Sequence, residues 1–158
     1  MNKSIKVFLA IITLGLAVAG CKKDTAEEKD TEYPKILATA NSFPTQCSTI
    51  ARGQTFTFRA TFSDNRELGA YSLDVHHNFD QHNHSTEVNQ CTFDAKKTPV
   101  KPFLFIQNYT IPAGLKQHEA TAQIAIPADI DPGDYHFMIR LTDKEGWQTI
   151  KGLSIKIQ

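Results

Sequence analysis

The chain has 158 residues, with 17 Lys and Arg balanced by 17 Asp and Glu, and 41% of its residues are hydrophobic. This length favours a single folded domain. No cluster of Lys and Arg offers the positive surface that nucleic-acid phosphates require, so we expect no nucleic-acid partner. The composition also excludes collagen, a coiled coil and a fully disordered chain.

The first twenty residues have the pattern of a secretory signal. Lys3 and Lys6 precede an apolar run, Val7 to Ala19, that is too short for a stop-transfer helix. The run ends in Val-Ala-Gly-Cys21, which resembles the lipobox of bacterial lipoproteins. That resemblance implies cleavage before Cys21 and acylation of this cysteine, whereas the alternative is an ordinary signal peptide that contains a cysteine. Several acyl chains on one residue would anchor the protein stably in a membrane.

Residues 21–34 are predicted to be a flexible tether, because Lys22 to Tyr33 is polar, charged and without apolar periodicity. A Lys after the lipidated cysteine, with acidic residues soon after it, resembles lipoproteins exported to the outer-membrane surface of some Gram-negative groups. The expected location is therefore the outer membrane, with membrane lipid as the first partner. The periplasmic and cell-surface faces both remain open.

Residues 35–158 are predicted to form one all-β domain, because hydrophobic residues alternate with polar ones at period two. No segment has the pattern of an amphipathic helix. Turn-forming residues separate the alternating runs, and the spacing favours an immunoglobulin-like antiparallel β-sandwich of about seven strands. The strands are expected at 35–41, 53–63, 69–78, 103–110, 118–126, 134–142 and 147–157, the fourth in the chain position of strand D of an immunoglobulin domain.

Cys47 and Cys91 are the two cysteines that remain if Cys21 is lipidated. In an oxidising compartment an even pair is most simply a disulfide, which would constrain the unfolded chain. The alternatives are two free buried thiols or two soft metal ligands.

Asp131-Pro-Gly133-Asp-Tyr135 matches the D-x-G-x-Y pattern of the tyrosine corner of immunoglobulin-like domains. In that corner the tyrosine ring packs inward and its hydroxyl bonds to backbone at the turn. Phe137 stands where antibody domains place their second cysteine, and the following Leu141 to Trp147 segment resembles a hairpin of bacterial Ig-like modules. The resemblance is therefore to the sandwich and not to the antibody branch.

Four of the six histidines, His76, His77, His82 and His84, lie within nine residues. Histidine-rich tracts are a signal for metal binding. In an extended chain, residues i and i+2 point to the same side, so the imidazoles of His82 and His84 can converge on one cation. Asp80 is a weaker candidate ligand, and it could instead hydrogen-bond to an imidazole.

His136 joins these candidates through the expected topology. The third and sixth strands are antiparallel neighbours in an immunoglobulin arrangement, which places His136 and His76 at the same level on the outer face. His77 should point inward and is a weaker candidate, and His118 begins a strand at the opposite end and is not expected to be a ligand. The alternative interpretation of the histidines is a solvated polar loop.

An imidazole cluster without thiolate suits Zn²⁺ or Cu²⁺ better than Ca²⁺. Metal affinity should fall as the pH drops through the ordinary range of histidine titration. A metalloenzyme would need a free acid or base beside the metal, and the sequence contains no catalytic motif of a known type, so we favour binding over catalysis. A third candidate is a protein- or glycan-interaction module without metal, using Met138, Arg140 and Trp147.

The whole layout combines a lipobox, a short tether and an Ig-like domain with two characteristic segments, HHNFDQHNHSTE and PGDYHFMIRLTDKEGW. It resembles a family of Gram-negative lipoproteins that is known only as a domain of unknown function. The likeness covers most of the mature chain but implies no activity.

Overall fold

The computed structural model describes residues 29–88 and 90–158, and the regular structure of these residues is entirely β. The expected signal peptide and the lipidation site Cys21 lie outside the described residues. The strands are β1 (Lys35–Leu37), β2 (Thr49–Ile50), β3 (Thr55–Ser63), β4 (Leu68–His77), β5 (Phe105–Thr110), β6 (Gln117–Ala125), β7 (Gly133–Asp143) and β8 (Gln148–Ile157).

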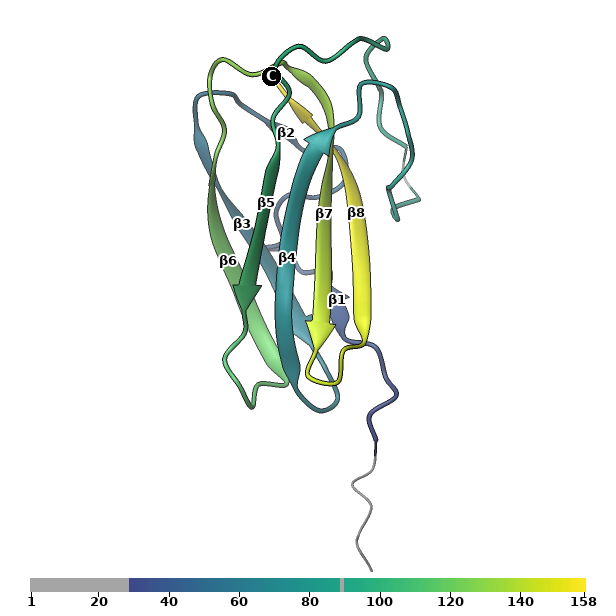
Figure 1. Cartoon of the computed structure of the whole chain (residues 1–158), viewed down its shortest axis with the longest axis vertical. Coiled ribbons are helices and arrows are strands. Elements are labelled where there is room, and N and C mark those ends of the chain that lie inside the picture. The colour runs from purple at the N-terminus through teal and green to yellow at the C-terminus, as the bar shows by residue number, and fades with distance from the viewer. Residues whose placement is uncertain (1–28, 89) are drawn as a thin grey trace, which may run out of the picture.

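The strands form two packed sheets, as predicted for a β-sandwich (Figure 1). One sheet has the order β1-β3-β6 and the other has the order β2-β8-β7-β4-β5. Within the second sheet β7 lies between β4 and β8 and is antiparallel to both. The outward side chains of β7 therefore have a neighbouring strand on both sides.

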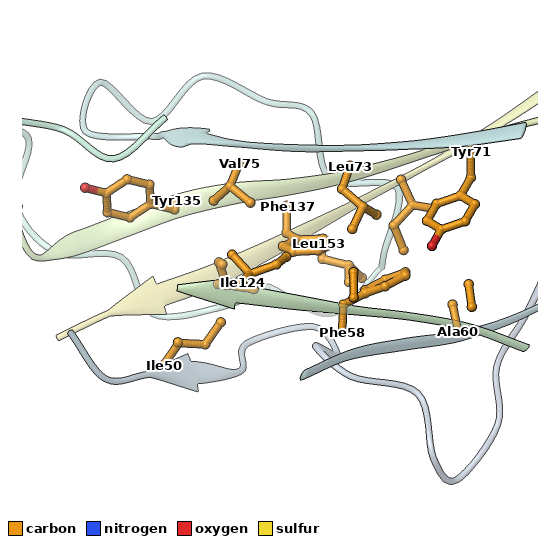
Figure 2. Close-up of a cluster of buried hydrophobic side chains, with 14 of the residues drawn as sticks. Ile50, Phe58, Ala60, Tyr71, Leu73, Val75, Ile124, Tyr135, Phe137 and Leu153 are labelled. Atoms are coloured by element: carbon orange, nitrogen blue, oxygen red, sulfur yellow. The ribbon is translucent and has the colours of Figure 1, made fainter. Parts of the chain in front are cut away.

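The hydrophobic residues that alternate with polar ones in the sequence form the core of the sandwich. Phe58 on β3, Tyr71 on β4 and Phe137 on β7 lie between the sheets with exposures of 4% or less, and the Phe58 and Phe137 ring centres lie 5.7 Å apart. Figure 2 shows these rings among aliphatic side chains such as Leu153 and Ile124 from both sheets. The predicted inward faces of the long strands are confirmed, because period-two burial is the only way for each sheet to cover its apolar side.

Two details of the topology differ from the expectation. The strand predicted at 103–110 does not take the place of strand D: it is β5, and it pairs with β4 at the edge of the five-stranded sheet. The sandwich is also not wholly antiparallel, since the short β2 runs parallel to β8. An alternating strand can pair with either sheet without changing its buried face, so periodicity could not decide its partner.

The turn before β7 has the hydrogen bonds of a tyrosine corner. The buried Tyr135 hydroxyl donates to the Asp131 carbonyl oxygen at 2.6 Å and accepts from the Phe103 backbone N–H at 3.1 Å. Gly133 has a φ of 130°, a conformation that L side chains rarely adopt, which explains the glycine in the motif. The corner joins the start of β7 to the segment that leads into β5.

A long connection, residues 78–104, leaves the end of β4 and passes over the outer side of β7 and β8 before it returns to β5. The predicted disulfide is confirmed: Cys91 in this connection is bonded to Cys47 just before β2. The Thr86 N–H also donates to the Gly152 carbonyl oxygen on β8 at 2.9 Å. These contacts fix a segment that has no strand or helix among its described residues, 78–88 and 90–104.

Residues 29–34, the described part of the expected tether, contact the domain. Asp30 is buried, and the Tyr33 ring packs edge-on against Trp147 with 5.0 Å between ring centres. Among the residues that the structure describes, there is no helix long and apolar enough to cross a membrane.

Candidate metal centre

Strand register brings two histidines from distant parts of the chain together. His76 at the end of β4 is paired with His136 near the start of β7, and their ring centres are 5.5 Å apart. Their neighbours Val75 and Phe137 point into the core, so both imidazoles lie on the outer face of the five-stranded sheet. This face is where the sequence predicted them.

The 78–104 connection brings His82 and His84 over this pair. The ring centres of His82 and His84 are 4.9 Å apart, and each lies 5.6 Å from that of His76. Their distances to the His136 ring centre are 4.8 and 5.2 Å. The four imidazoles predicted as ligands therefore form one cluster, which we call the histidine cluster.

Three members of the histidine cluster offer nitrogens in a ligand-like arrangement. His76, His82 and His84 each have one ring nitrogen within 4.8 Å of the others. A tetrahedral ion with metal–nitrogen bonds of 2.0–2.1 Å needs nitrogens roughly 3.3 Å apart. Small rotations of these partly exposed rings can bring the nitrogens from within 4.8 Å to the spacing that an ion needs.

Two carboxylates orient these rings. Asp74 Oδ1 lies 2.7 Å from His76 Nδ1, and Asp80 Oδ1 lies 2.5 Å from His82 Nδ1. A proton on each Nδ1 leaves the Nε2 lone pair free, which is the usual way in which a carboxylate prepares an imidazole for a metal. The hydrogen bond from His82 also lowers the pKa of Asp80, so this carboxylate stays ionised.

His136 lies beneath the other three and is almost fully buried, with 1% exposure. Its Nε2 donates to the His82 carbonyl oxygen at 3.0 Å, so its Nδ1 carries the lone pair. That Nδ1 is buried without a hydrogen-bond partner among the described residues. Burial, followed by the neighbouring imidazoles, lowers the pKa of His136 to about 4, so this ring is neutral at physiological pH.

The remaining candidates occupy different places. His77 packs against the Phe79 ring, 5.0 Å between centres, and does not join the histidine cluster. Asp80 reaches the cluster through His82. His118, which was not expected to be a ligand, lies on β6 near Tyr71 on the other side of the core.

Sequence reasoning missed two features of this centre. Asp74 could have been found, because it lies two residues before His76 on the same face of one strand. Gly152 could not, because its role depends on how the 78–104 connection docks. A Cβ at this position would lie 1.9 Å from the His84 carbonyl oxygen.

A groove of about 400 Å³ runs along the outer face of the five-stranded sheet and ends at His76 and His84. Its walls come from β4, β5, β7 and β8, and they include Ile106, Met138 and Ile150, with Arg140 further along. Trp147, the other residue predicted for an interaction surface, lies outside this groove and packs against Tyr33.

Fold and site together define a two-sheet β-sandwich with an imidazole cluster at the end of its larger sheet. The chain belongs to the family described as Domain of unknown function (DUF4625), which matches residues 20–158. No curated protein matches the chain.

Proposed function

We propose that this protein binds a transition metal ion, Zn²⁺ or Cu²⁺, through His76, His82 and His84, with the buried His136 as a fourth donor. The observation that carries the proposal is the convergence of these four rings from β4, β7 and one connection. A solvated polar loop gives no reason for four imidazoles to lie with ring centres within 5.6 Å of one another, whereas a cation does.

The chemistry of the donors selects the kind of ion. Neutral imidazole suits Zn²⁺, Cu²⁺ and Ni²⁺, whereas Ca²⁺ and Mg²⁺ take oxygen ligands. The unpartnered Nδ1 of His136 supports its role as a donor, because a buried lone pair without a partner is costly unless an ion or a proton donor occupies it.

Binding fits the site better than catalysis. A catalytic metal needs a positioned acid or base that is free to exchange a proton. The carboxylates nearest to the rings, Asp74 and Asp80, are already held by His76 and His82. We therefore propose metal binding, in uptake, storage or delivery, as the function. The lipobox-like Val-Ala-Gly-Cys21 segment supports the further proposal that an acylated Cys21 anchors the protein to the outer membrane.

Titration of tag-free full-length protein with Zn²⁺ and Cu²⁺ tests the proposal. We expect one ion per chain at neutral pH, and weaker binding at mildly acidic pH because the imidazoles protonate. The double variant H82A/H84A should lose the ion, and the matched control H118A should retain it. Equal binding by all three proteins, or binding by none, would refute a site in the histidine cluster.

The second candidate function is a protein- or glycan-interaction module, and the groove favours it. Ile106 and Ile150 beside the groove are 62% and 45% exposed. A glycan array and an outer-membrane extract, probed with wild-type protein and with the I106D variant, would separate the two functions. Retention that depends on Ile106 but not on added metal would favour the interaction module.

A further inference from the structure

A second group of ligand-type side chains lies at the opposite end of the sandwich, where residues 29–34 meet the β7–β8 turn (Figure 1). Asp30, Asp143 and Glu145 each have a carboxylate oxygen within 4.8 Å of the others. The two aspartates are buried, and Glu145 is exposed. We call these three residues the acidic cluster.

Asp143 ends β7 and holds the turn with only one of its oxygens. Its Oδ1 accepts from the backbone N–H groups of Gly146 and Trp147, at 2.6 and 2.7 Å. Its Oδ2 is buried and has no hydrogen-bond partner among the described residues, although the residue is only 3% exposed. The turn therefore accounts for the position of Oδ1, but it gives no reason for the burial of Oδ2.

Asp30 repeats this arrangement from the N-terminal side. Its Oδ1 accepts from the Glu32 N–H at 3.0 Å and from Asn65 Nδ2 at 2.9 Å, whereas its Oδ2 is buried without a partner in the described part of the chain. The residue is 2% exposed. The Glu32 N–H, followed by Asn65, lowers the pKa of Asp30, which keeps this carboxylate ionised.

A buried carboxylate oxygen without a partner is costly, and placing a second one beside it adds repulsion between like charges. The charge of Arg66 acts on Asp30. The three neighbouring carboxylates of the acidic cluster together carry more negative charge than one such cation offsets. A divalent cation bound by the acidic cluster would offset this charge, and it would give a ligand to the Oδ2 atoms that have no partner among the described residues.

We propose that the acidic cluster is a Ca²⁺ site. Carboxylate oxygens are the ligands of hard cations, and Ca²⁺ accepts the irregular geometry of a turn and a chain segment, whereas Mg²⁺ demands a near-ideal octahedron. The exposed Glu145 can supply a third carboxylate, and the space around Gly146 is open, so water can complete the coordination. This site shares no residue with the histidine cluster.

Calcium at this position joins the N-terminal segment to the sandwich. Asp30 precedes β1, and Asp143 and Glu145 lie at the β7–β8 turn. Two contacts already join these segments. Trp147 Nε1 donates to the Asp30 carbonyl oxygen at 3.0 Å, and the Tyr33 ring packs against the Trp147 ring. The ion would hold the point where the chain enters the domain.

Trp147 provides a local signal, because it is the only tryptophan in the chain and contacts Asp30. The experiment is a CaCl₂ titration of full-length protein, followed by tryptophan fluorescence and by calorimetry. We expect a saturable change with a Kd on the order of 10⁻⁴ to 10⁻³ M, the range of extracellular calcium modules. The melting temperature should rise with calcium in the same range of concentrations.

Three variants locate the ion. E145Q, which changes an exposed side chain and should fold normally, is expected to weaken the response at least tenfold, and D30N should abolish it. The matched control E119Q changes an exposed glutamate on β6 and should respond like the wild type. A response that Mg²⁺ or NaCl reproduces at equal ionic strength, or one that is unchanged in E145Q and D30N, would overturn the proposal. H82A/H84A should respond fully, so failure of the histidine proposal leaves this test intact.

Discussion

At the scale of single residues, the histidine cluster shows how a carboxylate decides which nitrogen of an imidazole is available. Asp74 and Asp80 each lie two residues before the histidine that they contact, His76 and His82. In an extended chain this spacing places donor and acceptor on the same side. A short local pattern, D-x-H, therefore sets the tautomer of two proposed ligands.

We predict that D80N weakens metal binding by about 10- to 100-fold, because an amide holds and polarises the His82 ring less well than a carboxylate does. Competition with a chromophoric chelator measures the change. D129N is the matched control, since Asp129 pairs with Lys101 away from the cluster. Equal losses in both variants would mean that general charge, and not the contact with His82, sets the affinity.

His136 predicts how stability depends on pH in metal-free protein. Burial lowers its pKa to about 4, against an ordinary value of 6.5. Above pH 6.5 both the folded and the unfolded states are neutral at this residue. Between pH 6.5 and 4 only the unfolded chain takes up the proton, so stability falls as the pH falls, by about 3 kcal/mol in total.

Urea unfolding in the presence of a chelator, at a series of pH values, measures this slope. The variant H136Q should flatten the loss between pH 6.5 and 4, whereas H118Q at the other end of the sandwich should not. The same slope in wild type and H136Q would show that another group takes up the proton.

At the scale of elements, the 78–104 connection forms the site only because β8 lets it approach. Gly152 on β8 has no side chain, and the His84 backbone and Met138 Sδ occupy the space that a Cβ would need, at 1.9 and 2.9 Å. The Thr86 N–H donates to the Gly152 carbonyl oxygen at the same place. Close packing of backbone on backbone positions the histidines of the connection.

We predict that G152A displaces the connection at His84 and lowers metal affinity by about tenfold or more. Calorimetric titration of the folded variant measures the effect. G69A is the control for general strain, because its Cβ would lie 2.6 Å from the Asp143 carbonyl oxygen, far along β4 from the histidines. Loss of affinity in G69A alone, or in neither variant, would contradict the role assigned to Gly152.

In the molecule as a whole, the two clusters of proposed metal ligands lie at opposite ends of the sandwich. Imidazoles gather at the end of the larger sheet where β4 ends and β7 begins, and carboxylates gather where β7 ends and β8 begins. β7 contributes to both through His136 and Asp143. The rigid central strand thus holds a proposed transition-metal site and a proposed calcium site at a fixed separation.

The corner that fixes the start of β7 should matter for global stability. We predict that Y135F costs about 1 to 3 kcal/mol, because the buried Phe103 N–H and the Asp131 carbonyl oxygen both lose their partner. Y109F is the matched control, since the Tyr109 hydroxyl makes no hydrogen bond to the described residues. Denaturant unfolding at neutral pH measures both, and equal stabilities would show that the corner contributes little.

Periodicity in the amino-acid sequence was enough to predict the sandwich class and the inward faces of the long strands, because strict alternation can bury one face only as a sheet. The Cys47–Cys91 disulfide was the simplest prediction for the two cysteines left beside Cys21, and the structure confirmed it over free thiols or metal ligands. The sequence also predicted that antiparallel register pairs His76 with His136, and that His82 and His84 in the loop after β4 lie over this pair. That they bind metal remains a prediction.

Three features could be learned only from the folded chain: which sheet receives β5, how the 78–104 connection covers His136, and that Asp30 lies beside Asp143. Each of these depends on contacts between segments far apart in sequence, whose local patterns fit several partners equally well. His136 and the two aspartates are buried because distant segments of the chain pack over them. The residues next to them in the sequence do not indicate which segments these are.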